Sequence, residues 1–154
     1  LNTARLAALG LLNARLEIGE VFAELPAWLD QGYRDCLLFP GESARVLPVP
    51  LQGDDRPLRL IVPDGTWRNP LLQTLPRVCL PDGLSSRYRL RKAPLAGALS
   101  TIEAVVVALQ LQEGEGRFAE LLAPFEALID GQIAAMGDVL YQRHHSPKPT
   151  QPAD

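Results

Sequence analysis

The sequence has few of the residues that build disulfide frameworks and metal centres. Its only two cysteines, Cys36 and Cys79, lack the Cys-x-x-Cys spacing of a structural zinc site. Both lie in apolar runs, so we expect small buried side chains rather than metal ligands. This usage of cysteine suits a reducing cytoplasm.

Long apolar runs are also missing. No stretch approaches the roughly 20 apolar residues that a membrane-spanning helix needs, and no basic-then-apolar signal peptide opens the chain. The 154 residues are 47% hydrophobic and 21% charged, which is the composition of one soluble globular domain. We therefore expect a cytoplasmic protein that does not contact a membrane.

An overall excess of basic residues is absent as well. The formal net charge of −3 argues weakly against non-specific nucleic-acid binding. The charges are uneven, however, because residues 63–112 contain six basic and three acidic residues between two acidic flanks. The basic residues gather in RYRLRK, 87–92. Such a strip can contact phosphates even on an acidic protein, although a solvated edge strand would give the same pattern.

Short apolar runs alternate with helical periodicity along the chain. This alternation predicts an α/β protein with a mainly parallel sheet and flanking helices. Residues 1–142 are expected to form the domain, and the polar, proline-rich residues 143–154 a tail. We expect strands over 36–41, 58–62, 77–80 and 87–91, an edge strand or loop over 46–50, and helices over 3–12, 22–31 (interrupted by Pro26), 69–75, 103–112 and 118–136.

The stretch PDGTW, 63–67, ends a buried-looking strand with a carboxylate, a glycine, a hydroxyl and an indole in a row. It resembles the signature of the DTW-domain family, and the resemblance extends from about residue 2 to 110. Ala4 stands where the family usually has glycine. Four further elements agree in the same order, namely NTARL at 2–6, LLFPG at 37–41, LRK at 90–92 and LSTIEA at 99–104.

The resemblance implies a tRNA-uridine aminocarboxypropyltransferase. Such enzymes transfer the 3-amino-3-carboxypropyl group of S-adenosylmethionine to the ring imide nitrogen of uridine and release methylthioadenosine. The implied fold is related to the SPOUT class, whose C-terminal half can form a trefoil knot around the cofactor. Family members often carry a cysteine-rich segment before the domain, so here it has either been lost or precedes Leu1.

The resemblance and the chemistry together assign the catalytic residues. Removing the imide proton needs a base, and Asp64 is the carboxylate expected to act as one; the alternative is that it caps the following helix. Thr66 is expected to hydrogen-bond substrate or cofactor, or to cap the helix. Trp67 is expected to stack on a base or to pack in the core.

Strand ends and one helix start are the expected cofactor site, because ligands of parallel sheets bind at the carboxyl ends of strands. The helix that opens at Ser100 offers backbone donors for an anion, which is compatible with a capping box between Ser100 and Glu103. We expect the cofactor to contact Leu38, Phe39, Pro40, Gly41, Gly65, Leu80, Pro81, Leu99, Ser100 and Thr101.

The basic strip is the expected tRNA contact. Arg89, Arg91 and Lys92 suit phosphate groups, and no residue is expected to bind a metal. Two other functions stay open. One is a SPOUT-type RNA methyltransferase, which would release adenosylhomocysteine, and the other is an RNA-binding module without catalytic activity.

Overall fold

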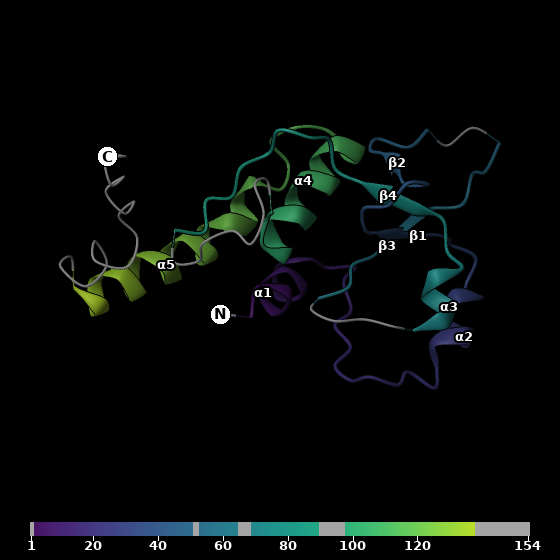
Figure 1. Ribbon diagram of the computed structural model, residues 1–154, viewed down its shortest axis with the longest axis horizontal. Helices are drawn as coiled ribbons and strands as arrows, with labels where there is room; N and C mark the ends of the chain where they lie inside the picture. Colours follow the sequence, from purple (N-terminus) through teal and green to yellow (C-terminus); the bar gives the residue numbers. More distant parts are fainter. Residues whose placement is uncertain (1, 51–52, 65–68, 90–97, 138–154) are drawn as a thin grey trace, which may run out of the picture.

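The computed structural model describes residues 2–50, 53–64, 69–89 and 98–137. Within these residues, four parallel strands form one sheet with the order β2-β4-β1-β3 (Figure 1). The strands are β1 (Arg34–Leu38), β2 (Arg45–Val46), β3 (Leu58–Ile61) and β4 (Arg77–Cys79). The prediction of an α/β protein with a mainly parallel sheet is confirmed.

The strands are staggered along the sheet. β1 and β3 end at the same level, because Leu37 pairs with Ile61. β4 begins where β1 ends, because Leu37 also pairs with Arg77. The turns that follow β1 and β3 therefore leave the same edge of the sheet, whereas the carboxyl end of β4 lies farther along.

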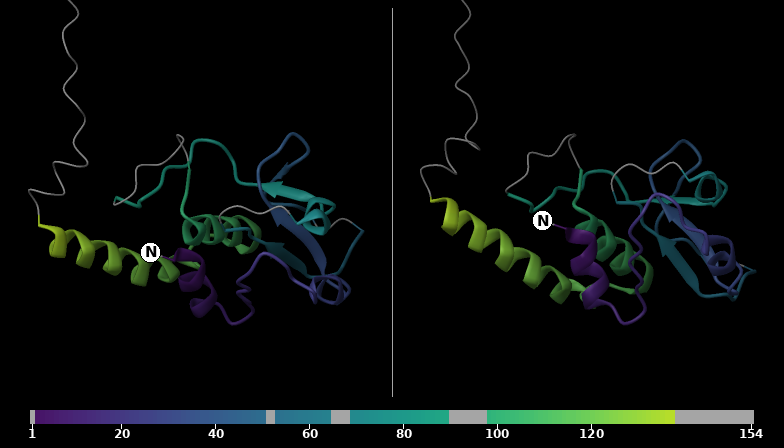
Figure 2. Two further views of the ribbon diagram at one scale, coloured as in Figure 1. Left: turned by 60° about the horizontal axis from the view of Figure 1, so that its bottom comes forward. Right: turned by 90° about the horizontal axis from the view of Figure 1, so that it is seen from below.

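Helices cover both faces of the sheet (Figures 1 and 2). Short helices lie on one face, and on the other α4 lies against the sheet with α1 and α5 behind it. None of the helices in the described residues is long and apolar enough to cross a membrane. The helices are α1 (Thr3–Gly10), α2 (Leu25–Leu29), α3 (Pro70–Gln73), α4 (Thr101–Glu113), the 3₁₀ helix η1 (Ala119–Leu121) and α5 (Leu122–Met136).

The alternation of side chains along β1 builds two cores. Cys36 and Leu38 face α4, whereas Leu37, which is fully buried, faces α2 and α3. Burial raises the pKa of the Cys36 thiol, as expected of a small core side chain. The pattern explains why this strand is apolar at consecutive positions, since both of its faces are covered.

The helix α4 is an inner layer of the molecule. Its residues from Thr101 to Gln112 are all at least half-buried, because one side packs on the sheet and the other on α1 and α5. Ile102 joins Phe125 and Ile129 of α5 in a separate core cluster. The expected burial of this helix on most sides is confirmed. Of the apolar stripe expected on α5, Phe125 and Ile129 are buried, whereas Leu128 and Met136 are 42% and 39% exposed.

Several predicted boundaries change for local reasons. Pro26 lies in the first turn of α2 and does not interrupt it, because proline is tolerated where a helix N–H has no partner. Asn69 caps α3, since its Oδ1 accepts from Leu71 N at 3.0 Å. Residues 118–121 precede α5 and contain the 3₁₀ turn η1. The predicted tail, 143–154, lies outside the described residues.

The predicted strand over 87–91 is wrong in its described part. Arg87, Tyr88 and Arg89 lie outside the sheet. The backbone N–H of Arg87 donates instead to the Glu103 carboxylate at 2.5 Å, and Tyr88 packs against Phe125. The alternating pattern of this segment therefore reflects packing along helices rather than pairing with a strand.

Candidate functional site

Asp64 lies just beyond the carboxyl end of β3 and contacts the start of α4. Its Oδ1 accepts a hydrogen bond from Thr101 Oγ1 at 2.7 Å, and Asp64 itself is exposed. The predicted base and a predicted cofactor residue, 37 positions apart, are thus in direct contact. The alternative role of Asp64 as the cap of α3 is not observed, because Asn69 fills it.

The start of α4 is closed by the predicted capping box. The backbone N–H and the hydroxyl of Ser100 both donate to Glu103 Oε2, at 2.8 and 2.6 Å. Both residues are 5% exposed. A capping box satisfies only some of the first-turn N–H groups, so this helix start keeps donors that an anion can use.

Glu103 also binds residues outside the helix start. Its carboxylate also accepts from Ser86 Oγ at 2.8 Å and from Arg87 N at 2.5 Å. Burial would raise the pKa of Glu103, but the hydrogen bonds from Ser100, Arg87 and Ser86 outweigh burial and lower it. Glu103 therefore fixes the start of the basic strip against α4.

This wider role of Glu103 was missed in the sequence. The pattern Ser-x-x-Glu indicates a cap and nothing more. No local signal marks Ser86 or Arg87 as further partners, because they lie 17 and 16 positions away.

The turn after β1 packs on Arg77, the first residue of β4. The Arg77 guanidinium lies 5.8 Å from the centre of the Phe39 ring. A Cβ added to Gly41 would lie 2.9 Å from Arg77 Nη1. Gly41 thus allows a close approach between this turn and an arginine that sequence reasoning did not single out.

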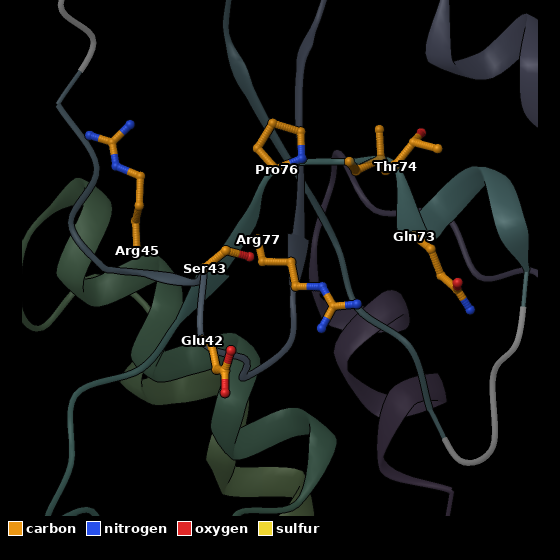
Figure 3. Close-up of a pocket in the computed structure, with 8 residues that line it drawn as sticks. Glu42, Ser43, Arg45, Gln73, Thr74, Pro76 and Arg77 are labelled. Atoms are coloured by element: carbon orange, nitrogen blue, oxygen red, sulfur yellow. The ribbon is translucent and has the colours of Figure 1, made fainter.

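A hollow of about 600 Å³ lies beside this turn (Figure 3). The side chains of Arg45 and Arg77, both part of its lining, point in different directions. None of the predicted cofactor residues lines this hollow, so it is not the predicted cofactor site. Its lining consists of Glu42, Ser43, Arg45, Gln73, Thr74, Leu75, Pro76 and Arg77.

The other predicted cofactor residues divide between core and surface. Leu38 and Leu80 pack beneath α4 in the core, so the contacts expected of them are backbone contacts. Pro81 and Leu99 are half-buried and Pro40 is exposed. The remaining predicted residues, namely Gly65, Thr66, Trp67, Arg91 and Lys92, lie outside the described residues.

The described part of the basic strip lies along α5. Arg87 Nη1 donates to Glu126 Oε1 at 3.2 Å, and Arg89 Nη2 pairs with Asp130. The predicted phosphate ligand Arg89 is therefore ion-paired within the molecule. Across the described residues, no group of three His, Cys, Asp or Glu side chains could hold a metal ion.

The sequence model of the DTW domain family matches residues 1–133 of this chain. The chain belongs to the DTW domain family. The family suggested by the PDGTW stretch is thereby confirmed over most of the chain.

Two curated relatives of this DTW chain are both named tRNA-uridine aminocarboxypropyltransferase 2. The protein of Macaca fascicularis is 31% identical, over 71% of this chain and 40% of its own length. The protein of Mus musculus is 32% identical, over 63% of this chain and 36% of its own length. The chain thus spans 40% or less of the length of these relatives. No solved structure matches it.

Proposed function

We propose that this DTW domain transfers the 3-amino-3-carboxypropyl group of S-adenosylmethionine to the ring imide nitrogen of a tRNA uridine. The observation that carries the proposal is the hydrogen bond between Thr101 and Asp64. It brings the carboxylate of the family motif to the start of α4, at the edge of the sheet where ligands of parallel sheets bind. The activity for which the two relatives are named agrees with it.

The residues at this edge fit S-adenosylmethionine. Its amino-acid end carries a carboxylate, which suits the first-turn donors of the 13-residue helix α4. The backbone that follows β1 and β4, from Leu38 to Gly41 and at Leu80 and Pro81, is proposed to hold the nucleoside end. When bound, the cofactor supplies the electrophilic carbon attached to its sulfonium sulfur.

Asp64 is proposed to take the imide proton of uridine, because the protonated nitrogen is a poor nucleophile. Thr101 engages Oδ1 of Asp64, and we assign the proton to Oδ2. One nitrogen–carbon bond forms, one carbon–sulfur bond breaks, and methylthioadenosine leaves. The transfer of this arm instead of the methyl group is then a matter of which carbon faces the nitrogen.

The other predicted residues complete the proposal. Thr66 and Trp67 belong to the catalytic turn, Gly65 and Leu99 to the cofactor site, and Arg91 and Lys92 to the tRNA contact. The catalytic domain is taken to reach residue 142. The relation to the SPOUT class and the C-terminal knot stay predictions, which an experimental structure with bound cofactor would test.

The test is a product assay with S-adenosylmethionine and unmodified tRNA, read by mass spectrometry of nucleosides and spent cofactor. We expect aminocarboxypropyl-uridine and methylthioadenosine. Asp64→Asn should lower the rate by roughly 10²–10⁴-fold, as loss of a general base does. The matched control is Asp54→Asn, which changes a half-buried carboxylate paired with Arg56 and should leave the rate unchanged.

Other products would assign another function. Adenosylhomocysteine in place of methylthioadenosine would make the domain a methyltransferase. Binding of tRNA without either product would make it an RNA-binding module. Full activity of Asp64→Asn would remove Asp64 from the catalytic role while keeping the activity.

A further inference from the structure

The start of the basic strip is anchored without the help of its arginine side chains. The ring of Tyr88 meets the ring of Phe125 edge to face, with centroids 5.2 Å apart, in the cluster that contains Ile102 and Ile129. Glu103 holds the backbone on the N-terminal side of Tyr88. The conformation of residues 86–88 is therefore fixed by buried contacts.

The two arginines that flank Tyr88 reach successive turns of α5. Arg87 pairs with Glu126 and Arg89 with Asp130. Four residues of helix rise about 6 Å, and the backbone turns tightly at Tyr88, because Arg89 N donates to Arg87 O at 2.9 Å. Arg87 and Arg89 thus reach carboxylates one helical turn apart, and the two ion pairs form side by side.

Both pairs lie in solvent. The side chains are 72% and 45% exposed for Arg87 and Glu126, and 52% and 65% exposed for Arg89 and Asp130. Exposed pairs of this kind contribute little to stability. A polyanion can reach these guanidinium groups, but it must first displace a carboxylate from each.

We propose that Glu126 and Asp130 compete with RNA phosphates for Arg87 and Arg89 and thereby weaken unspecific RNA binding. The inference rests on the proposed action on tRNA. An RNA that contacts only the strip replaces two existing ion pairs and therefore gains little binding affinity. An RNA that also places a uridine at Asp64 gains further contacts, so the two carboxylates increase the preference for the proper substrate.

The test measures binding of a fluorescently labelled 20-mer of oligouridylate at several salt concentrations. The variant Glu126→Gln with Asp130→Gln removes both competitors. We expect its affinity to rise roughly fivefold to twentyfold, as the loss of two exposed ion pairs allows. The slope of log affinity against log salt should become steeper by up to about 1.4, because two more phosphate contacts form.

The matched control is Glu115→Gln with Glu120→Gln, which changes the net charge by the same amount. Both residues are exposed, Glu115 in the turn after α4 and Glu120 in η1. An equal gain in both variants would overturn the inference, since net charge alone would explain it. A lower affinity of the Glu126/Asp130 variant would also overturn it, because the carboxylates would then position the arginines for RNA.

The outcome is separable from that of the proposed function. Methylthioadenosine formed by the wild-type protein, with no gain in affinity of the variant, would refute only the competition. A gain in affinity confined to the Glu126/Asp130 variant, with no product from the wild type, would support the competition and refute the transferase.

Discussion

Carboxylates of two helices contact the segment that begins at Ser86. Glu103 of α4 is buried and accepts hydrogen bonds from Ser86, Arg87 and Ser100. Glu126 and Asp130 of α5 are exposed and pair with arginine side chains. The hydrogen bonds to Glu103 compensate for the hydration that its carboxylate loses on burial, so breaking them is costly. The exposed ion pairs of Glu126 and Asp130 are weaker, because water and ions compete for the same groups.

The largest expected effect is the removal of the buried carboxylate. Glu103→Ala should lower the free energy of unfolding by about 3 kcal/mol, because it leaves buried donors of Ser100 and Arg87 without an acceptor. Urea denaturation measures the loss. The control, Glu113→Ala at the exposed end of the same helix, should change stability by less than about 0.5 kcal/mol. Equal losses of stability in Glu103→Ala and Glu113→Ala would show that the buried carboxylate is no more important than an exposed one.

The same carboxylate should give stability a dependence on pH. The folded-state pKa of Glu103 is lowered, so its contribution is complete above the ordinary value of roughly 4.3 and is lost as the pH falls through the folded-state pKa. Urea midpoints measured from about pH 6 to about pH 3 test this. The decline should be shallower in Glu103→Gln, and an unchanged decline would assign it to other carboxylates.

A smaller effect is expected from the contact between Thr101 and Asp64. Thr101→Val removes the donor to Asp64 and should lower the turnover number up to about tenfold, with the KM for tRNA unchanged, because Asp64 is less well oriented. Thr101→Ser should restore the rate. The control is Thr74→Val, which removes an exposed hydroxyl that donates to Leu71 O. A change in KM alone would indicate a role in binding.

The smallest effect concerns the exposed pairs. Glu126→Gln with Asp130→Gln should change the free energy of unfolding by at most about 1 kcal/mol. Thermal unfolding at low and high salt checks this. The unfolding temperatures of the wild type and the variant should converge at high salt. A loss as large as that of Glu103→Ala would show that α5 holds the strip as firmly as α4 does.

The sequence predicts much of the scaffold because its signals are local. The capping box at Ser100 and the period of α5 both arise from residues within a few positions of one another. The segment RYRLR misled the same reasoning. Its described side chains do alternate, because Tyr88 packs on Phe125 while Arg87 and Arg89 lie in solvent. Periodicity alone cannot tell whether the packing partner is a helix or a strand.

The sequence predicted the motifs of the candidate site but not the contacts between them. The motifs around Asp64 and Ser100 were found separately, as a strand end and a helix start. That Asp64 accepts from Thr101, and that Gly41 lies against Arg77, could not be read from either motif. The first contact depends on how α4 packs on the sheet, and the second on the register of β1 and β4. Residue patterns within one element determine neither.

By itself, the sequence determined the α/β class, the family and the capping box that opens α4. These depend on neighbouring residues, whose hydrogen bonds and periodicity act over a few positions. Only the tertiary structure decided that Glu103 would hold Ser86 and Arg87, and that Arg89 would meet Asp130, 41 positions away. Such pairings form because burial of the apolar faces of α4 and α5 brings distant segments together.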